Sequence, residues 1–358
     1  MFTLENLVRE NIKRLTPYSS ARKEFTGAAR IFLDANENSF GSPLPENYNR
    51  YPDPLQWKIK EKIAAINSVK PPQIFIGNGS DEAIDLLLRI FCEPTVEEII
   101  ITPPTYGMYE VSANINDVLV NPVLLNSDFQ INPHQILSHV DKELTKLIFL
   151  CSPNNPTGNS FERAAILEIV KNFHGIVIVD EAYIHFSKQK SLVDEIINFP
   201  NLVILQTFSK AWGLAGLRVG LAFANEEIIA QFNKVKPPYN ISEIAQNAIS
   251  DALEKRGEVE KTIEKIISER EKLIENLRTI SVMTKIYPTD ANFVLVKTID
   301  AEKVYNFLLA EKIVVRNRNN VELCEGCLRI TIGTPDENEN LLKALEKFTT
   351  EAYMTQNF

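Results

Sequence analysis

Short runs of apolar residues at positions 147–151, 176–179, 202–206 and 221–223 constrain the fold of this chain more than any other feature. A strand with one face in water alternates apolar and polar residues, whereas a strand covered on both faces is apolar nearly throughout. From position 58 onward, such strand patterns alternate with helical patterns, which is typical of a parallel sheet between two layers of helices. The sequence therefore predicts an α/β fold with a large, mostly parallel, doubly wound sheet.

The last third of the chain shows a different pattern, which predicts a second, smaller domain. After two consecutive prolines at 237–238, a charged helical stretch covers 242–277, either as one long helix or as two helices joined near Gly257. Strand and helix patterns then mix between 293 and 348, which indicates an α+β unit. We expect three parts: an N-terminal arm that packs with the small domain or with a partner subunit (1–30), a large domain (31–240), and a small C-terminal domain that includes the connecting helix (241–358).

Two segments precede the alternating region. A helical pattern covers 4–15 and stops before Thr16-Pro17, because a residue that precedes proline avoids the helical conformation. The stretch 36–54 is rich in proline and asparagine and is too long for a simple connector. We therefore expect a short helix in the arm and a long, functional loop after it.

Charge and apolar run length argue against nucleic-acid and membrane partners. The formal net charge is -9, and the 38 Lys and Arg residues are scattered along the chain. No apolar run approaches the roughly 18 residues that a membrane span needs. The N-terminus lacks the basic and apolar regions of a secretory signal, so we expect a cytoplasmic protein without nucleic-acid or membrane partners.

The cysteines and histidines give no support for a metal site. Cys324 and Cys327 form a single C-x-x-C pair with no second pair nearby, whereas a structural zinc needs four ligands. The four histidines are isolated from one another. Four cysteines in so long a chain fit a reducing compartment, and the role of the C-x-x-C pair stays open.

One lysine and one aspartate stand where a parallel sheet opens at its carboxyl edge. Lys210 follows the apolar run 202–206 among small residues, and a desolvated, neutral amine there can add to an aldehyde to form a Schiff base. Asp180 ends the run 176–179 and could keep a pyridine nitrogen protonated. Taken singly, the lysine is better explained as a surface-loop residue, and the aspartate is explained equally well as a helix cap.

Two further loops share this edge. The segment 152–158, Ser-Pro-Asn-Asn-Pro-Thr-Gly, follows the apolar run 147–151. The segment 77–82, Gly-Asn-Gly-Ser-Asp-Glu, follows a strand pattern and opens a helix, where free backbone amides can hold a phosphate. Glycine at a strand-to-helix turn also has a purely steric explanation. The segment 77–82 therefore indicates a phosphate site only in combination with Lys210, Asp180 and the segment 152–158.

These four segments, in this order, resemble the fold type I pyridoxal-phosphate-dependent aminotransferases over nearly the whole chain. The resemblance implies pyridoxal 5'-phosphate as cofactor and Lys210, Asp180 and Tyr183 as catalytic residues, with Lys210 binding the cofactor covalently and Asp180 paired with its pyridine nitrogen. Asn155 and Tyr183 would donate to its phenolic oxygen, and Tyr106, otherwise a core residue, would stack on its ring. The 5'-phosphate would be held by Gly79, Ser80, Asp81, Ser209 and Arg218.

Four other segments, 15–18, 33–38, 50–54 and 328–334, are similar to the histidinol-phosphate aminotransferase family. This implies transamination of L-histidinol phosphate with 2-oxoglutarate, giving imidazole-acetol phosphate and L-glutamate in histidine biosynthesis. It also implies a homodimer in which Tyr51 reaches the cofactor phosphate of the neighbouring subunit. The residues implied in substrate binding are Tyr18, Asn155, Arg316 and Arg329. Serine at 39 and Ser-Ser-Ala at 19–21 replace prolines and a glycine common in that family.

Three alternatives share the same machinery. An aromatic amino-acid aminotransferase or a phosphothreonine decarboxylase would use the same lysine, aspartate and phosphate loop. A cofactor-binding transcriptional regulator would need an attached DNA-binding module. We expect no such module, because only about 30 residues precede the catalytic region and they include no basic helical segment.

Overall fold

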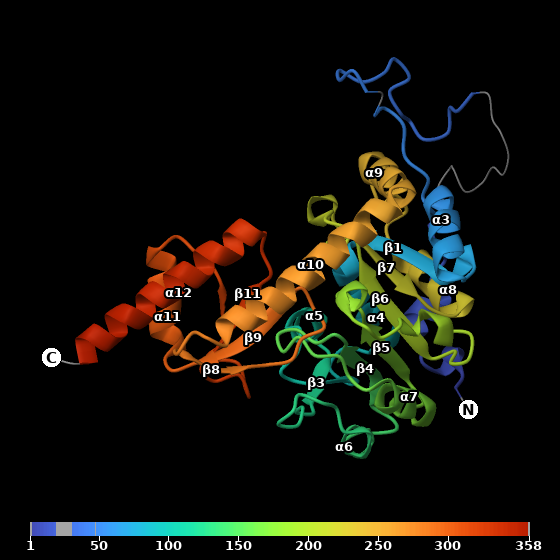
Figure 1. Ribbon diagram of the computed structural model, residues 1–358. Helices are drawn as coiled ribbons and strands as arrows, with labels where there is room; N and C mark the ends of the chain where they lie inside the picture. Colours follow the sequence, from blue (N-terminus) through green and yellow to red (C-terminus); the bar gives the residue numbers. More distant parts are fainter. Residues whose placement is uncertain (1, 19–30, 47, 357–358) are drawn as a thin grey trace.

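The computed structural model describes residues 2–18, 31–46 and 48–356, with side chains to residue 350. Its larger sheet has seven strands in the order β1-β7-β6-β5-β4-β2-β3 (Figure 1). Only β7 runs antiparallel to its two neighbours, so the predicted mostly parallel sheet is confirmed. The strands are β1 (Ile74–Asn78), β2 (Glu98–Ile101), β3 (Leu119–Pro122), β4 (Thr145–Cys151), β5 (Ile176–Asp180), β6 (Leu202–Thr207) and β7 (Val219–Phe223).

The central strands are buried on both faces, as their apolar runs predict. Along β5, Ile176 and Ile178 point into one core and Val177 and Val179 into the other, because successive side chains of a strand alternate between faces. Helices cover both faces and shield these side chains from water. They are α3 (Trp57–Asn67), α4 (Gly79–Phe91), α5 (Met108–Ile115), α6 (Pro133–Ser138), α7 (Arg163–Asn172) and α8 (Glu226–Val235).

The C-terminal unit has a four-stranded antiparallel sheet in the order β10-β11-β9-β8. Helix α10 runs from the large sheet to this unit (Figure 1). The elements that follow α8 along the chain are α9 (Glu243–Glu254), α10 (Arg256–Leu277), β8 (Met283–Ile286), β9 (Phe293–Thr298), α11 (Ala301–Ala310), β10 (Arg316–Asn317), β11 (Cys327–Thr331) and α12 (Pro335–Gln356). The helical stretch is thus broken at Lys255, two residues before Gly257, which confirms the two-helix alternative.

Helix α9 packs with the large domain, although we expected the small domain to begin at 241. Its residues Ile249 and Leu253 are buried in the same core as Ile59 and Ile63 of α3. The apolar face of α9 is therefore covered by the large sheet unit, and only the elements from α10 onward build the small one.

The start of the arm also packs on the large domain, where we expected the small domain or a partner subunit. It forms a 3-10 turn (Leu4–Asn6) and helix α1 (Glu10–Arg14) rather than one helix over 4–15. Its apolar residues are buried against α4 and α8, and Arg9 Nε lies 3.1 Å from the Glu93 carboxylate. The break covers residues 7–9, where the Arg9 N–H donates to the Ile90 carbonyl at the end of α4 at 3.0 Å. Residues 19–30 lie outside the described ranges.

Residues 31–46 and 48–51 extend away from the body of the chain (Figure 1), whereas the Asp53 and Pro54 carbonyls accept from Gln246 and Lys236 of the large domain. Several large apolar side chains on this segment are exposed, among them Ile31, Leu33 and Phe40. The segment is organised locally by Glu37, whose carboxylate accepts from Arg50 and from the Tyr51 N–H at 2.7 Å. In the described ranges, no helix is both long and apolar enough to cross a membrane.

Candidate active site

A cavity of about 870 Å³ opens at the carboxyl ends of the parallel strands. Because β1, β4, β5 and β6 run in the same direction, the loops that follow them meet at this edge. Residues of the C-terminal sheet close the opposite side. The predicted site residues that line this cavity are Gly79, Ser80, Asp81, Tyr106, Asn155, Asp180, Tyr183, Ser209, Lys210, Arg218, Arg316 and Arg329.

The first turn of α4 and the loop before β7 form a narrow cup. Gly79 has φ +72°, and its N–H donates to the Arg218 carbonyl at 2.8 Å. A Cβ on Gly79 would lie 2.9 Å from Arg218 Nη2, and one on Gly220 would lie 2.1 Å from the Ser80 nitrogen. Glycine at these two positions therefore brings the α4 N-terminus against β7. Backbone N–H groups in the first turn of a helix have no intrahelical partner, so with Arg218 they can hold an anion.

Lys210 follows β6 and reaches the cavity. Its Nζ lies 5.7 Å from the centre of the Tyr183 ring, which is buried and packs edge-on against Phe293. Partial burial and the charge of Arg329 lower the pKa of the Lys210 amine. Asp180 opposes this shift. A lysine in this setting is more readily neutral than a surface lysine, as covalent catalysis requires.

Asp180 is a buried carboxylate with a second tyrosine as partner. Its Oδ2 accepts from the Tyr109 hydroxyl at 2.8 Å, and its Oδ1 accepts from the Ala182 N–H at 3.0 Å. Burial raises the pKa of Asp180 to about 6, and these two hydrogen bonds act in the opposite direction. Sequence reasoning missed Tyr109. Its spacing of one helical turn from Tyr106 was the signal available, but it does not distinguish a functional hydroxyl from a core aromatic.

We expect Tyr109→Phe to weaken cofactor binding about tenfold, because the lost hydrogen bond to a charged carboxylate contributes on the order of 1.5 kcal/mol. The pKa of Asp180 should rise further, since the hydroxyl now favours its charged form. Absorbance titration of the apoprotein with pyridoxal phosphate measures the affinity. Tyr305→Phe, which removes a hydroxyl in the small domain, is the matched control. Equal affinities in the two variants would exclude this role for Tyr109.

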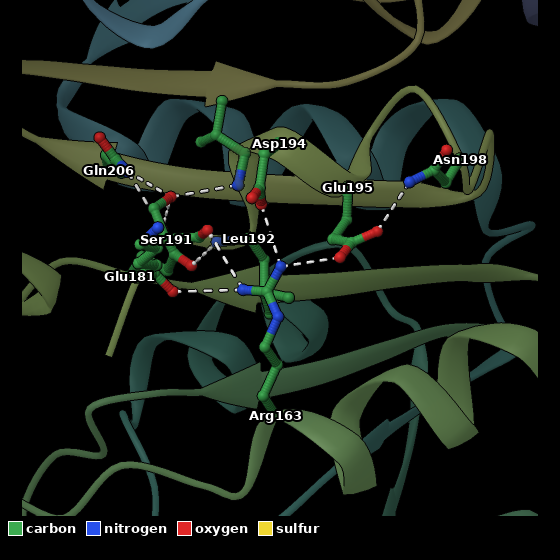
Figure 2. Close-up of polar contacts among 10 residues, drawn as sticks. Arg163, Glu181, Ser191, Leu192, Asp194, Glu195, Asn198 and Gln206 are labelled. Atoms are coloured by element: carbon green, nitrogen blue, oxygen red, sulfur yellow. Dashed lines mark hydrogen bonds and ion pairs between the residues drawn. The ribbon is translucent and has the colours of Figure 1, made fainter. Parts of the chain in front are cut away.

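Glu181, the residue after Asp180, is held by three hydrogen-bond donors. Its carboxylate accepts from the Ser191 hydroxyl, from the Leu192 N–H at 2.7 Å and from the Gln206 amide at 3.0 Å (Figure 2). These contacts connect the end of β5 to the segment 191–195 and to β6, and so fix the loop that presents the cavity residues. Figure 2 also shows the neighbouring ion pairs of Arg163 with Asp194 and Glu195.

The buried Glu181 should make the stability of the apoprotein pH-dependent. Burial raises its pKa to about 7, from 4.5. A folded-state pKa above the unfolded value means that the stabilising contribution is complete below about pH 4.5 and is lost as pH rises through 7. We expect Glu181→Gln to remove on the order of 1 to 3 kcal/mol of this change. Urea unfolding of both proteins at pH 5 and pH 8 measures it, and parallel losses in both would contradict the assignment.

Three arginines from the small sheet face the cavity. Arg316 and Arg329 are directly opposite each other on β10 and β11. Arg329 also donates to the Asn155 side-chain oxygen, and its guanidinium lies 5.1 Å from the Phe293 ring centre. Arg318, which sequence reasoning did not single out, lines the same cavity. Its spacing of two residues from Arg316 was the available signal, because alternate residues of a strand share a face.

Two predicted residues do not line the cavity. Tyr18 is exposed at the end of the described range 2–18. Tyr51 is half-exposed on the projecting segment, where its ring stacks on Tyr239 with centres 4.4 Å apart. A single chain therefore leaves both tyrosines outside its own site.

Comparison with known proteins agrees with this architecture. The model of the aminotransferases of class I and II matches residues 35–345. A curated histidinol-phosphate aminotransferase from Parabacteroides distasonis is 51% identical over 346 residues, covering 97% of this chain and 99% of that protein. The crystal structure of the histidinol-phosphate aminotransferase from Clostridium acetobutylicum superposes with a TM-score of 0.79 at 29% identity, covering 85% of this chain and 92% of the other.

A third relative shares the fold at lower identity. The histidinol-phosphate aminotransferase from Sinorhizobium meliloti, solved in complex with pyridoxal-5'-phosphate, has a TM-score of 0.79 at 23% identity and covers 89% of this chain and 90% of that one. The predicted fold type I architecture is thereby confirmed. This chain belongs to the class I and II aminotransferases and, among them, to the histidinol-phosphate aminotransferase family.

Proposed function

We propose that this chain is a pyridoxal-phosphate-dependent enzyme of histidine biosynthesis. It transfers the amino group of L-histidinol phosphate to 2-oxoglutarate and yields imidazole-acetol phosphate and L-glutamate. The observation that carries the proposal is the cavity that combines Lys210 and Asp180 with an anion cup and a cluster of arginines. Relatives about half identical over nearly the full chain carry the name of this activity.

The residues of the cavity fit the cofactor. The cup at Gly79 is kept open by the missing side chain, and it offers the first-turn amides of α4, Ser209 and Arg218 to the 5'-phosphate. Buried Asp180 faces the cavity and would pair with the pyridine nitrogen, with Tyr109 orienting its carboxylate. Tyr106 would stack on the ring, and its hydroxyl donates to Asp81 at 3.2 Å. Asn155 and Tyr183 would donate to the phenolic oxygen.

When bound, pyridoxal phosphate supplies an electron-accepting ring that stabilises negative charge at the substrate Cα. The chain supplies the base. Lys210, with its lowered pKa, would take the proton from the substrate Cα and pass it to the C4' carbon of the bound cofactor in the same half-reaction. Arg329 and Arg316 hold the anionic end of the substrate, because a planar guanidinium accommodates both a phosphate and a carboxylate. Tyr18 stays a predicted helper for the substrate phosphate.

We also propose a cytoplasmic homodimer in which Tyr51 completes the neighbouring site. The projecting segment exposes Ile31, Leu33 and Phe40, which a second copy would cover. Mixing Tyr51→Ala with Lys210→Arg tests the sharing, since a mixed dimer has one site with both residues intact. If the mixture is more active than the two separate variants added together, the shared site is supported. If its activity equals their sum, the shared site is contradicted.

An amino-donor panel tests the activity. Holoenzyme is incubated with 2-oxoglutarate and, in turn, histidinol phosphate, phenylalanine, tyrosine and phosphothreonine, and both glutamate and carbon dioxide are measured. We expect the highest kcat/KM for histidinol phosphate, with glutamate as product. Preference for an aromatic donor, or carbon dioxide release from phosphothreonine, would replace the proposed activity with another of the same fold.

A further inference from the structure

The small sheet presents three arginines on one face. Arg316 and Arg329 are cross-strand partners, and the Arg318 N–H donates to the Cys327 carbonyl at 2.9 Å, which continues the pairing of β10 with β11. Arg316 and Arg318 are two residues apart, so their side chains share a face, while Asn317 between them points the other way. All three arginines line the active-site cavity.

This arrangement is costly without a ligand. Like charges directly opposite each other on paired strands are destabilising. None of the three arginines forms an ion pair with a described carboxylate, including Glu322, which also lines the cavity. The Nε atoms of Arg318 and Arg329 are buried and have no hydrogen-bond partner in the described part of the chain. Burial and the charges of Arg329 and Arg316 lower the pKa of Arg318 to about 10.

A phosphate monoester suits this cluster better than a carboxylate does. It carries a charge of about -1.5 to -2 at neutral pH and three terminal acceptor oxygens. A carboxylate balances the charge of one guanidinium group, whereas a phosphate monoester balances nearly two, so the phosphate leaves less unmatched positive charge in a cluster of three arginines. Charge-assisted hydrogen bonds of this kind are also the strong ones.

We propose that Arg318 is a third binding residue for the substrate phosphate and a determinant of the preference for a phosphate monoester over a carboxylate. This inference rests on the proposed function, which supplies the phosphate-bearing donor. Arg318 adds a third cation to the pair formed by Arg316 and Arg329. The two half-reactions therefore differ in the number of arginines that contact the substrate anion. The donor phosphate contacts all three arginines, whereas the carboxylate of 2-oxoglutarate depends on Arg329 and Arg316.

The test is Arg318→Gln in the holoenzyme, with Arg318→Lys as the conservative variant. We expect the KM for histidinol phosphate and the inhibition constant of inorganic phosphate to rise about tenfold or more in Arg318→Gln. The KM for 2-oxoglutarate should change less than about threefold, and Arg318→Lys should recover part of the loss. Arg256→Gln removes an exposed arginine of α10 that pairs with Glu260, and serves as the matched control.

Three outcomes would overturn the inference: unchanged KM for histidinol phosphate, equal increases in both KM values, or a fall in kcat alone. Calorimetric titration of the holoenzyme with inorganic phosphate separates this inference from the proposed function. If the wild-type protein does not use histidinol phosphate but binds inorganic phosphate more tightly than Arg318→Gln does, the proposed function fails and the anion site stands. Equal phosphate affinities overturn the site itself.

Discussion

Lys210→Arg should lower kcat by at least about 10⁴-fold, because one substitution removes both the covalent attachment and the base at the substrate Cα. A positioned base alone contributes about 10²- to 10⁴-fold. Arginine keeps the positive charge in the cavity but cannot be deprotonated in a protein, so it can neither attack an aldehyde nor accept the proton. Steady-state rates with histidinol phosphate and 2-oxoglutarate measure the loss.

The control for this variant is Lys265→Arg, which changes an exposed lysine of α10 in the same way. It should retain wild-type rates. The absorbance of bound cofactor should also change in Lys210→Arg alone, since only that protein binds pyridoxal phosphate without a covalent bond. A Lys210→Arg enzyme with more than about one hundredth of the wild-type kcat would be incompatible with the role given to this lysine.

Asp180→Asn should lower kcat/KM about 10²- to 10⁴-fold and, at the same time, stabilise the apoprotein. The catalytic loss follows because removing one partner of a buried charged pair costs about 3 to 5 kcal/mol. The asparagine oxygen can still accept the Tyr109 hydroxyl at the same place, so the local packing is kept. The amide, however, cannot keep a pyridine nitrogen protonated.

The gain in stability follows from the sign of the pKa shift. Burial raises the pKa of Asp180 from 3.8 to about 6, so its charged form is disfavoured in the folded apoprotein. The penalty is absent below about pH 3.8 and complete above about pH 6. We expect Asp180→Asn to stabilise the apoprotein by about 1 to 3 kcal/mol at pH 8 and little at pH 4. Asp251→Asn, at an exposed position on α9, should change neither activity nor stability.

Finding both effects in one variant would distinguish a functional carboxylate from a structural one. Replacing an aspartate with a purely structural role would lower the activity and the stability of the protein together. If Asp180→Asn destabilises the apoprotein at pH 8, Asp180 is a structural residue and not a charge kept for the cofactor.

The sheet could be predicted because its central strands are apolar on both faces. The run 176–179 has no polar residue, and only a strand buried between two layers accommodates such a run. The carboxyl-edge loops follow from the same fact, because parallel strands deliver their ends to one edge. The sequence alone therefore predicts Lys210 and Asp180 at one edge of the sheet, where both line the same cavity.

Other features depend on tertiary contacts that sequence spacing does not encode. Tyr109 looks like a core aromatic until its hydroxyl is seen to lie 2.8 Å from Asp180. The sequence around Arg318 is typical of a surface residue. Its position in the cavity lining follows from the pairing of β10 with β11. The start of the arm has an amphipathic pattern, but the pattern alone does not say that α4 and α8 cover it.

The most direct test of the central claim, that Lys210 in this cavity carries the cofactor, is chemical. The purified holoenzyme is reduced with borohydride, which fixes the cofactor on its lysine, and the modified peptide is identified by mass spectrometry. We predict modification of Lys210 in the peptide that follows β6, and none in protein that was first stripped of cofactor. Cofactor fixed on any other lysine would contradict the account.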